Sequence, residues 1–165
     1  MTQNSFRASF RISESFRMRI VQANVDRLDD ITPLFIKYRE FYGQLPKPEA
    51  SRRFLHDRLV NEQAMILLAE DEDTGKVLGF CQFIPSFSAL TLKPSWVLKG
   101  IYVIEEARRH LVAHKLINHA KELAKAAGIK RMTVMTGEEN AAAHELYRSL
   151  GFSDDAEFTY FALKL

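Results

Sequence analysis

The feature that most constrains the fold is a change of periodicity in the middle of the chain. Three apolar runs rich in Val, Ile, Leu and Phe predict strands at 64–70, 76–87 and 95–104. On both sides of this region the apolar residues recur at helical spacing instead. Because helices next to a set of strands bury their apolar faces on a sheet, we expect a mixed α/β layer fold.

The flanking segments complete this pattern. Further strands are predicted at 17–23, 130–136 and 157–165, and helices at 28–43, 47–61, 107–128 and 138–151. Asp26 is the expected cap of the first helix, and Gly43 is its expected end. The order is therefore β-α-α-β-β-β-α-β-α-β. We expect an α/β fold with a mixed central sheet of six or seven strands, flanked by about four helices.

Length and composition indicate one domain. The chain has 165 residues, 47% of them hydrophobic, with 23 basic and 21 acidic side chains. No apolar run is long enough to span a bilayer, so we expect a cytoplasmic protein without membrane contact. Residues 17–165 are predicted to form the single domain, and residues 1–16 an Arg- and Ser-rich N-terminal arm. The composition of this arm also fits a transit peptide, which stays open as an alternative.

The cysteine and histidine content argues against a metal site. Cys81 is the only cysteine, which excludes an internal disulfide and a zinc site built from cysteines. It lies in an apolar run and is predicted to be a small buried hydrophobe. His110 and His114 have the spacing of a helical metal pair, but no third ligand follows at a matching distance. We therefore expect no metal.

The segment 101–121 joins a strand to a basic helix. The strand is expected to end at Ile104 and the helix to begin near Arg108. The first backbone N–H groups of a helix have no internal partner, and the helix dipole adds partial positive charge there. Arg108 and Arg109 add cationic side chains, so this end is predicted to bind an anion, most naturally phosphate. A solvated basic face is the alternative.

Two motifs in the second half of the chain resemble those of the GCN5-related N-acetyltransferase (GNAT) superfamily. The first, Arg/Gln-x-x-Gly-x-Gly/Ala at a helix start, stands here at 108–113 as "RRHLVA". The second, Asn and Ala before Leu-Tyr-x-x-x-Gly-Phe, stands at 140–152 as "NAAAHELYRSLGF". With the order of elements, the resemblance covers residues 17–165. It implies a GNAT domain that transfers acetyl from acetyl-CoA to an amine of a small molecule or protein.

The resemblance also assigns roles to individual positions. The positions for the pyrophosphate of the cofactor are Arg109, His110, Leu111, Val112 and Ala113, helped by the side chain of Arg108. The positions for the pantetheine arm and the thiol end are Ile101, Tyr102, Val103, Asn140 and Ala143. Tyr147 occupies the general-acid position and would lie near the thiol sulfur, although a packing role alone is the alternative. Oxyanion stabilisation would come from a backbone amide near Val103.

The sequence departs from the family pattern at two places. Leu111 stands where the first motif glycine is usual. Leucine suits an anion site if its backbone is already helical, so we expect a helical Leu111 and cofactor binding that is retained, weakened at most. Lys99-Gly100 replaces an Asn-Asp pair of a similar bacterial branch, so an acid is absent. Glu40, Glu70 and a water route are the candidates for the general base, and a reaction without a dedicated base is a further alternative.

Several alternatives remain open at this level. The departures motivate a catalytically weak or silent acyl-CoA-binding module of the same fold. Nucleic-acid binding through the basic helix is a third hypothesis, disfavoured by the net charge of +2 and the lack of a nucleic-acid motif; we expect no nucleic-acid partner. The aromatic residues that could form either an acceptor pocket or core are Phe83, Phe87, Trp96 and Tyr102. A homodimer is expected because dimers are common in the superfamily.

Overall fold

The computed structural model describes residues 17–154 and 161–165, so the N-terminal arm predicted at 1–16 lies outside the described residues. Its strands are β1 (Met18–Gln22), β2 (Met65–Asp71), β3 (Val77–Ser88), β4 (Lys93–Val103) and β5 (Arg131–Val134). Its helices are α1 (Leu28–Phe41), α2 (Pro48–Val60), α3 (Val112–Ala126) and α4 (Ala141–Ser149), with short 3₁₀ turns η1 (Val25–Arg27) and η2 (Glu105–Ala107).

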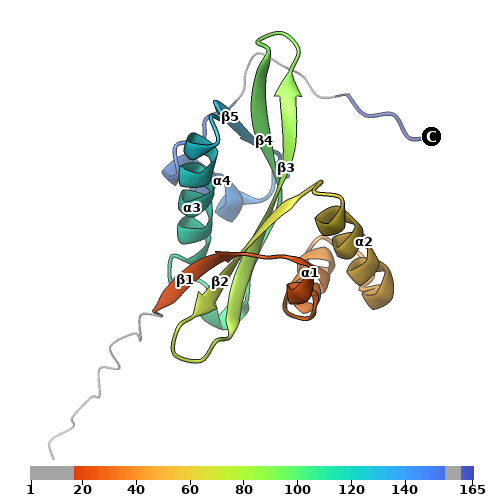
Figure 1. Cartoon of the computed structure of the whole chain (residues 1–165), viewed down its shortest axis with the longest axis vertical. Helices are drawn as coiled ribbons and strands as arrows, with labels where there is room; N and C mark the ends of the chain where they lie inside the picture. The colour runs from red at the N-terminus through yellow and green to blue at the C-terminus, as the bar shows by residue number, and fades with distance from the viewer. Residues whose placement is uncertain (1–16, 155–160) are drawn as a thin grey trace, which may run out of the picture.

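These elements form one mixed sheet with helices on both faces (Figure 1). The strand order is β1-β2-β3-β4-β5. The first four strands pair antiparallel, and β5 pairs parallel to β4. The parallel pair follows from the connection, because α3 carries the chain back across one face of the sheet before β5 begins.

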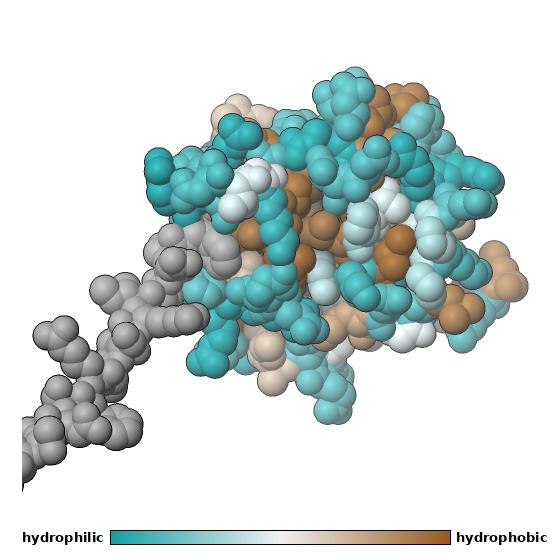
Figure 2. Space-filling view, turned by 90° about the horizontal axis from the view of Figure 1, so that it is seen from below, coloured by the Kyte–Doolittle hydropathy of each residue, from teal (hydrophilic) through white to brown (hydrophobic). Residues whose placement is uncertain are grey.

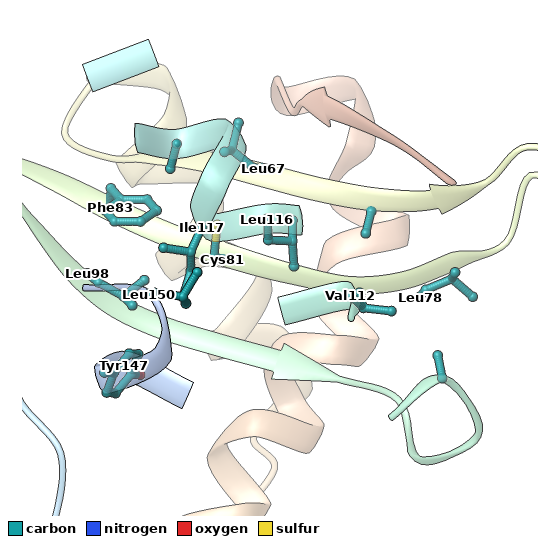
Figure 3. Close-up of a cluster of buried hydrophobic side chains, with 13 residues drawn as sticks. Leu67, Leu78, Cys81, Phe83, Leu98, Val112, Leu116, Ile117, Tyr147 and Leu150 are labelled. Atoms are coloured by element: carbon teal, nitrogen blue, oxygen red, sulfur yellow. The ribbon is translucent and has the colours of Figure 1, made fainter. Parts of the chain in front are cut away.

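Two clusters of buried side chains lie on opposite faces of the sheet. The α3 cluster packs α3 and α4 on one face, with Leu116, Ile117 and Leu150 among its members (Figure 3). The α1 cluster packs α1 and α2 on the other face. Successive residues of β2 alternate between the clusters, since Leu67 belongs to the first and Leu68 to the second. A strand that is buried on both faces explains the continuous apolar run in the sequence.

The surface and the helix lengths add two findings. The end of the molecule seen in Figure 2 is mostly hydrophilic, with its hydrophobic residues in small separate patches. None of the helices in the described residues is long and apolar enough to cross a bilayer. Cys81 is buried in the α3 cluster, as predicted, and burial raises the pKa of its thiol.

The predicted order of elements is confirmed as far as α4, but the number of strands is not. The sheet has five strands among the described residues, whereas six or seven were expected. The closing strand predicted at 157–165 falls partly outside the described residues. Its described end, 161–165, is not a strand, and the side chains of Phe161, Leu163 and Leu165 are exposed. Their alternation favours a strand only where a neighbouring strand pairs with them.

Two predicted helix starts are also wrong. Asn24, not Asp26, caps the first turn, because the Asn24 side chain accepts a hydrogen bond from the Asp26 amide at 3.0 Å. The helix predicted from Arg108 begins at Val112, because positive φ angles at Arg109 and Leu111 interrupt a helical path before that residue. The predicted end at Gly43 is confirmed, with Gly43 at φ 72° just after the C-cap of α1.

An ion cluster ties the first strand to the sheet. Glu70 in β2 is buried and bonds two arginines: Arg19 in β1 at 2.8 Å, and Arg27 in η1. Arg27 also donates to Asp30 at 2.6 Å. Burial opposes ionisation of Glu70, but the bonds and charges of the two arginines outweigh it and lower the pKa of the carboxyl. The cluster therefore connects β1, β2 and the start of α1.

Replacing Glu70 by Gln should lower the free energy of unfolding at pH 7 by about 1–3 kcal/mol, a range that allows for solvent screening of the arginines. Because the folded pKa lies below the unfolded value, the charge stabilises the fold above about pH 4.3 and ceases to do so as the pH falls through the folded pKa. Urea unfolding at pH 7 and pH 3 measures both effects. Glu106→Gln, in an exposed pair with Lys76, is the control without a measurable change. Equal stabilities of wild type and Glu70→Gln at pH 7 would contradict this account.

Candidate functional site

The turn between β4 and α3 has the geometry of an anion-binding loop. Arg109 and Leu111 both have positive φ angles, 65° and 61°. The first backbone bond within the helix runs from the Lys115 amide to the Leu111 carbonyl at 2.9 Å. The amides of 112–114 are therefore without helical partners at the positive end of the dipole. Turns that alternate handedness in this way present several N–H groups to one anion.

Leu111 corrects the sequence-based expectation. Its backbone is left-handed rather than helical, the conformation that the motif glycine adopts easily. A non-glycine residue there costs roughly 1–2 kcal/mol. The Leu111 side chain is 61% exposed, so it gains little burial in return. The chain therefore keeps the backbone geometry of the motif without the glycine, at a cost in stability.

Arg108 braces the end of β4 instead of extending from the turn. Its Nε donates to the Val103 carbonyl at 3.1 Å, and its guanidinium lies 5.6 Å from the centre of the Tyr102 ring. Its Nη1 atom also lies 4.0 Å from a carboxylate oxygen of Glu105. Two of the three β4 positions predicted to meet the pantetheine arm are thus in contact with Arg108.

The strands β4 and β5 separate before the turn that begins α3. Their parallel pairing covers Ser95 to Leu98 on β4 and ends opposite Val134. From Gly100 to Val103, β4 pairs with β3, and from Lys99 onward it has no strand on its other side among the described residues. A free strand edge offers N–H and C=O groups to an extended ligand. Ile101, Tyr102 and Val103 lie on this edge.

A bulge at Lys99 marks the point of separation. Gln82 of β3 pairs with Gly100 and Phe83 pairs with Leu98, so Lys99 is an extra residue. The insertion reverses the alternation of side chains. Leu98 and Ile101 consequently both pack in the α3 cluster, whereas Tyr102 packs in the α1 cluster.

Asn140 and Ala143 lie at the start of α4. The Asn140 side chain caps the helix by accepting a hydrogen bond from the Ala143 amide at 3.2 Å. This bond satisfies one of the free amides of α4 and orients the helix that bears Tyr147. The two residues are thus close together. Asn140 caps the helix, and its role at the thiol end of the cofactor stays a prediction.

Tyr147 lies in a groove between α4, β5 and α1. Its side chain is buried, and its ring packs on Phe152 at 5.7 Å between centroids. Burial, followed by the neighbouring Tyr42, Tyr38 and Cys81, raises the pKa of Tyr147 to about 12. Within the described part of the chain its hydroxyl has no hydrogen-bond partner, which leaves it free to donate to a ligand.

The groove brings together residues from distant parts of the sequence. Its lining includes Tyr38 and Tyr42 of α1, Tyr147 of α4, and the carboxyl end of β5. Tyr38 and Tyr42 were not among the predicted site residues. Their spacing of four in "YREFY" placed them on one face of a helix, but it did not indicate that this face meets the groove.

The two candidate bases have other partners. Glu70 is held by Arg19 and Arg27 in the ion cluster. Glu40 is exposed on α1 and pairs with Lys37 at 3.1 Å. Neither Glu40 nor Glu70 therefore lines the groove beside Tyr147.

The four aromatic residues considered for an acceptor pocket lie outside the groove. Phe83 is core, Trp96 and Tyr102 pack against the two clusters, and Phe87 is 80% exposed; none of these four lines the groove.

His114, one of the two histidines at helical metal spacing, forms a hydrogen bond with Ser149 through Nε2 at 2.9 Å. Among the residues that the structure describes, no three side chains of His, Cys, Asp or Glu are grouped to hold a metal.

The comparisons with known proteins decide the family. The model of the acetyltransferase (GNAT) family matches residues 28–152, which include the turn, the free edge of β4 and Tyr147. The chain belongs to the GNAT family. It is 34% identical over 148 residues to the uncharacterized N-acetyltransferase YhfO of Bacillus subtilis (strain 168), an alignment that covers 90% of this chain and 98% of that protein.

Solved structures agree with this assignment. A probable acetyltransferase matches with a TM-score of 0.85 at 50% sequence identity, over 89% of this chain and 97% of the other. A predicted acetyltransferase from Clostridium acetobutylicum, solved with acetyl-CoA, shares the fold with a TM-score of 0.72 at 14% identity, over 88% and 96% of the two chains. The GNAT fold and its acetyltransferase relatives identify this protein as an acyltransferase.

The strain at Leu111 can be measured directly. Leu111→Gly should raise the free energy of unfolding by about 0.5 kcal/mol, because relief of the left-handed backbone exceeds the entropy that glycine adds to the unfolded chain. Leu111→Ala is the matched control, since it removes the side chain but keeps the Cβ strain. Urea unfolding of the three proteins tests this. If Leu111→Gly is no more stable than Leu111→Ala, the backbone is not the source of the cost.

Proposed function

We propose that the protein transfers an acetyl group from acetyl-CoA to a primary amine of a small molecule or protein. The observation that supports this most is the free edge of β4 beyond Leu98, directly beside the left-handed turn that begins α3. An extended thioester arm and a pyrophosphate need these two features side by side. The acetyl-CoA bound by a relative of the same fold is consistent with the proposal.

The chain supplies the donor half of the site through backbone groups. The turn 109–113 binds the pyrophosphate with its amides, and 101–103 pairs with the pantetheine arm. When bound, acetyl-CoA supplies an activated acetyl carbonyl for attack by the amine. An amide near Val103 stabilises the charge that develops on the carbonyl oxygen. Arg108 holds this end of β4 in place through Val103 and Tyr102.

Tyr147 donates a proton or a hydrogen bond to the departing sulfur. Its pKa of about 12 keeps the hydroxyl protonated at every physiological pH. An ordinary thiol has a pKa of about 8.5, so Tyr147 holds its proton more tightly than the thiol of the product would. Donation of a strong hydrogen bond therefore suits this tyrosine better than complete proton transfer. The sulfur leaves as a hydrogen-bonded thiolate in the first case and as a thiol in the second, and either is a better leaving group than an unassisted thiolate.

The amine must lose a proton during the reaction. Because Glu70 is held by two arginines, and Glu40 is paired with Lys37, we assign this step to water in the groove.

A catalytically weak or silent acyl-CoA-binding module of the same fold is the second candidate function, favoured by the strained Leu111. A homodimer in the cytoplasm remains a prediction, and light scattering at micromolar concentrations tests the dimer.

Calorimetry with acetyl-CoA is the direct test of the donor site. We expect a dissociation constant in the micromolar range, weakened when dephospho-CoA replaces CoA, because a phosphate contributes charge-assisted bonds. Release of free CoA thiol is then followed with tyramine, spermidine, lysine and an alanyl peptide as acceptors. Binding without turnover on a wide panel would favour the silent module. Absence of binding at millimolar acetyl-CoA would contradict the proposed function.

Tyr147→Phe tests the role of the hydroxyl. We expect kcat to fall by about 100-fold, with the affinity for acetyl-CoA unchanged, because the ring and its packing on Phe152 remain. Thermal unfolding should be unchanged, since the hydroxyl has no partner within the described residues. Initial rates for the best acceptor, measured from pH 6 to 10, provide the comparison. Turnover equal to wild type across this range would show that Tyr147 only packs.

A further inference from the structure

The bulge of β4 turns Gly100 toward α1. Without the extra residue Lys99, residues 98, 100 and 102 would share one face of the sheet. With it, Leu98 and Ile101 pack toward α3, so Gly100 and Tyr102 face α1 and α2. The residue at position 100 is therefore the first one after the separation of β4 and β5 to meet the opposite helix layer.

Tyr38 of α1 occupies the space beside Gly100. A Cβ placed on Gly100 would lie 3.1 Å from Cζ of the Tyr38 ring and 3.4 Å from its hydroxyl oxygen. Contacts at 3.1 Å are closer than the van der Waals separation of two carbons, so a Cβ at position 100 would require the ring to shift by a few tenths of an ångström. The glycine and the tyrosine are complementary in size.

The Tyr38 hydroxyl also bonds the bulge itself. It donates to the Lys99 carbonyl at 2.9 Å, across 61 positions of sequence. The bond holds the carbonyl of the inserted residue toward α1. Burial, followed by Tyr42, raises the pKa of Tyr38, so the hydroxyl remains a donor throughout the physiological range.

The Tyr38 ring is itself fixed by its neighbours. Phe35 stacks on it at 6.0 Å, Phe80 of β3 meets it edge-on at 6.0 Å, and Tyr42 meets it edge-on at 5.2 Å. The helix end beyond it is anchored too, because Arg39 donates to the carbonyls of Leu45 and Pro46 at 2.6 and 2.8 Å. A ring held in this way transmits the position of α1 to the bulge.

We propose that Tyr38 is a positioning residue of the acyl-transfer site, which holds the Lys99–Gly100 bulge and thereby sets the direction in which β4 leaves β5. This inference rests on the proposed function, since the edge beyond the bulge is the proposed binding edge for the pantetheine arm. Tyr38 acts through the backbone of β4 and takes no part in proton transfer. Its loss should therefore weaken the pantetheine contacts and leave the pyrophosphate turn intact.

Tyr38→Phe tests this with two ligands that reach different distances into the site. The ring remains, but the donor to Lys99 is lost. We expect the affinity for acetyl-CoA to fall by about tenfold, the equivalent of one hydrogen bond, while the affinity for 3′,5′-ADP is unchanged. The nucleotide has no pantetheine arm, so it does not reach β4. Calorimetry at 25 °C, with near-UV circular dichroism to verify folding, measures both affinities.

Thr32→Val is the matched control on the same helix. Its hydroxyl donates to the Leu28 carbonyl at 2.6 Å, far from the bulge. It should lower the melting temperature as Tyr38→Phe does, and leave both affinities unchanged. Acetyl-CoA binding by Tyr38→Phe within twofold of wild type, or an equal loss for both ligands, would overturn the proposal. If the wild-type protein binds neither ligand, the proposed function fails instead.

Gly100→Ala provides a second, independent variant. Its added methyl group crowds the Tyr38 ring at 3.1 Å and should shift it by a few tenths of an ångström, so acetyl-CoA affinity should fall selectively here as well. Because both changes disturb one contact, the losses of the double variant Tyr38→Phe/Gly100→Ala should be smaller than the sum of the single losses. Strictly additive losses would show that Tyr38 and Gly100 act separately and would contradict the inference.

Discussion

The inserted residue Lys99 in β4 is the structural feature on which the rest of the site depends. Pairing with β5 ends at Leu98, and pairing with β3 continues to Val103. Within the described residues, one edge of β4 is therefore unpaired over five residues, while the other edge pairs with β3. A strand in this situation is rigid enough to present its amides and open enough to accept a ligand. The insertion also decides which helix layer each following side chain meets.

The two sides of the site use different physical means. The turn before α3 relies on backbone amides. Its shape requires two left-handed positions, which are occupied here by Arg109 and Leu111 and not by glycine. Local strain of this kind persists only where surrounding contacts hold the backbone. The groove relies instead on tyrosine hydroxyls, of which Tyr38 bonds β4 and Tyr147 has no partner in the described residues. A hydroxyl that lines a groove without a protein partner suits a group that meets its partner only when substrate binds.

The ion cluster and the groove beside Tyr147 lie at opposite edges of the sheet. The ion cluster around Glu70 joins β1, β2 and η1 on the side of the sheet away from β5. It stabilises the fold and leaves Glu70 unsuited to act as a base, because two arginines keep it ionised. The cost at Leu111 falls on the turn at the start of α3. A site can keep a strained turn when the framework around it is held by other contacts.

The sequence by itself determined the order of elements through α4 and the GNAT family. These depend on periodicity and on motifs of neighbouring residues, which are visible in a single chain. It did not predict the left-handed Leu111, because leucine disfavours that conformation and only the tertiary contacts impose it. It also missed Tyr38, whose bond to Lys99 spans 61 positions. That contact exists because α1 packs across β4 at a bulge, and the register of two strands was decided only when the sheet assembled.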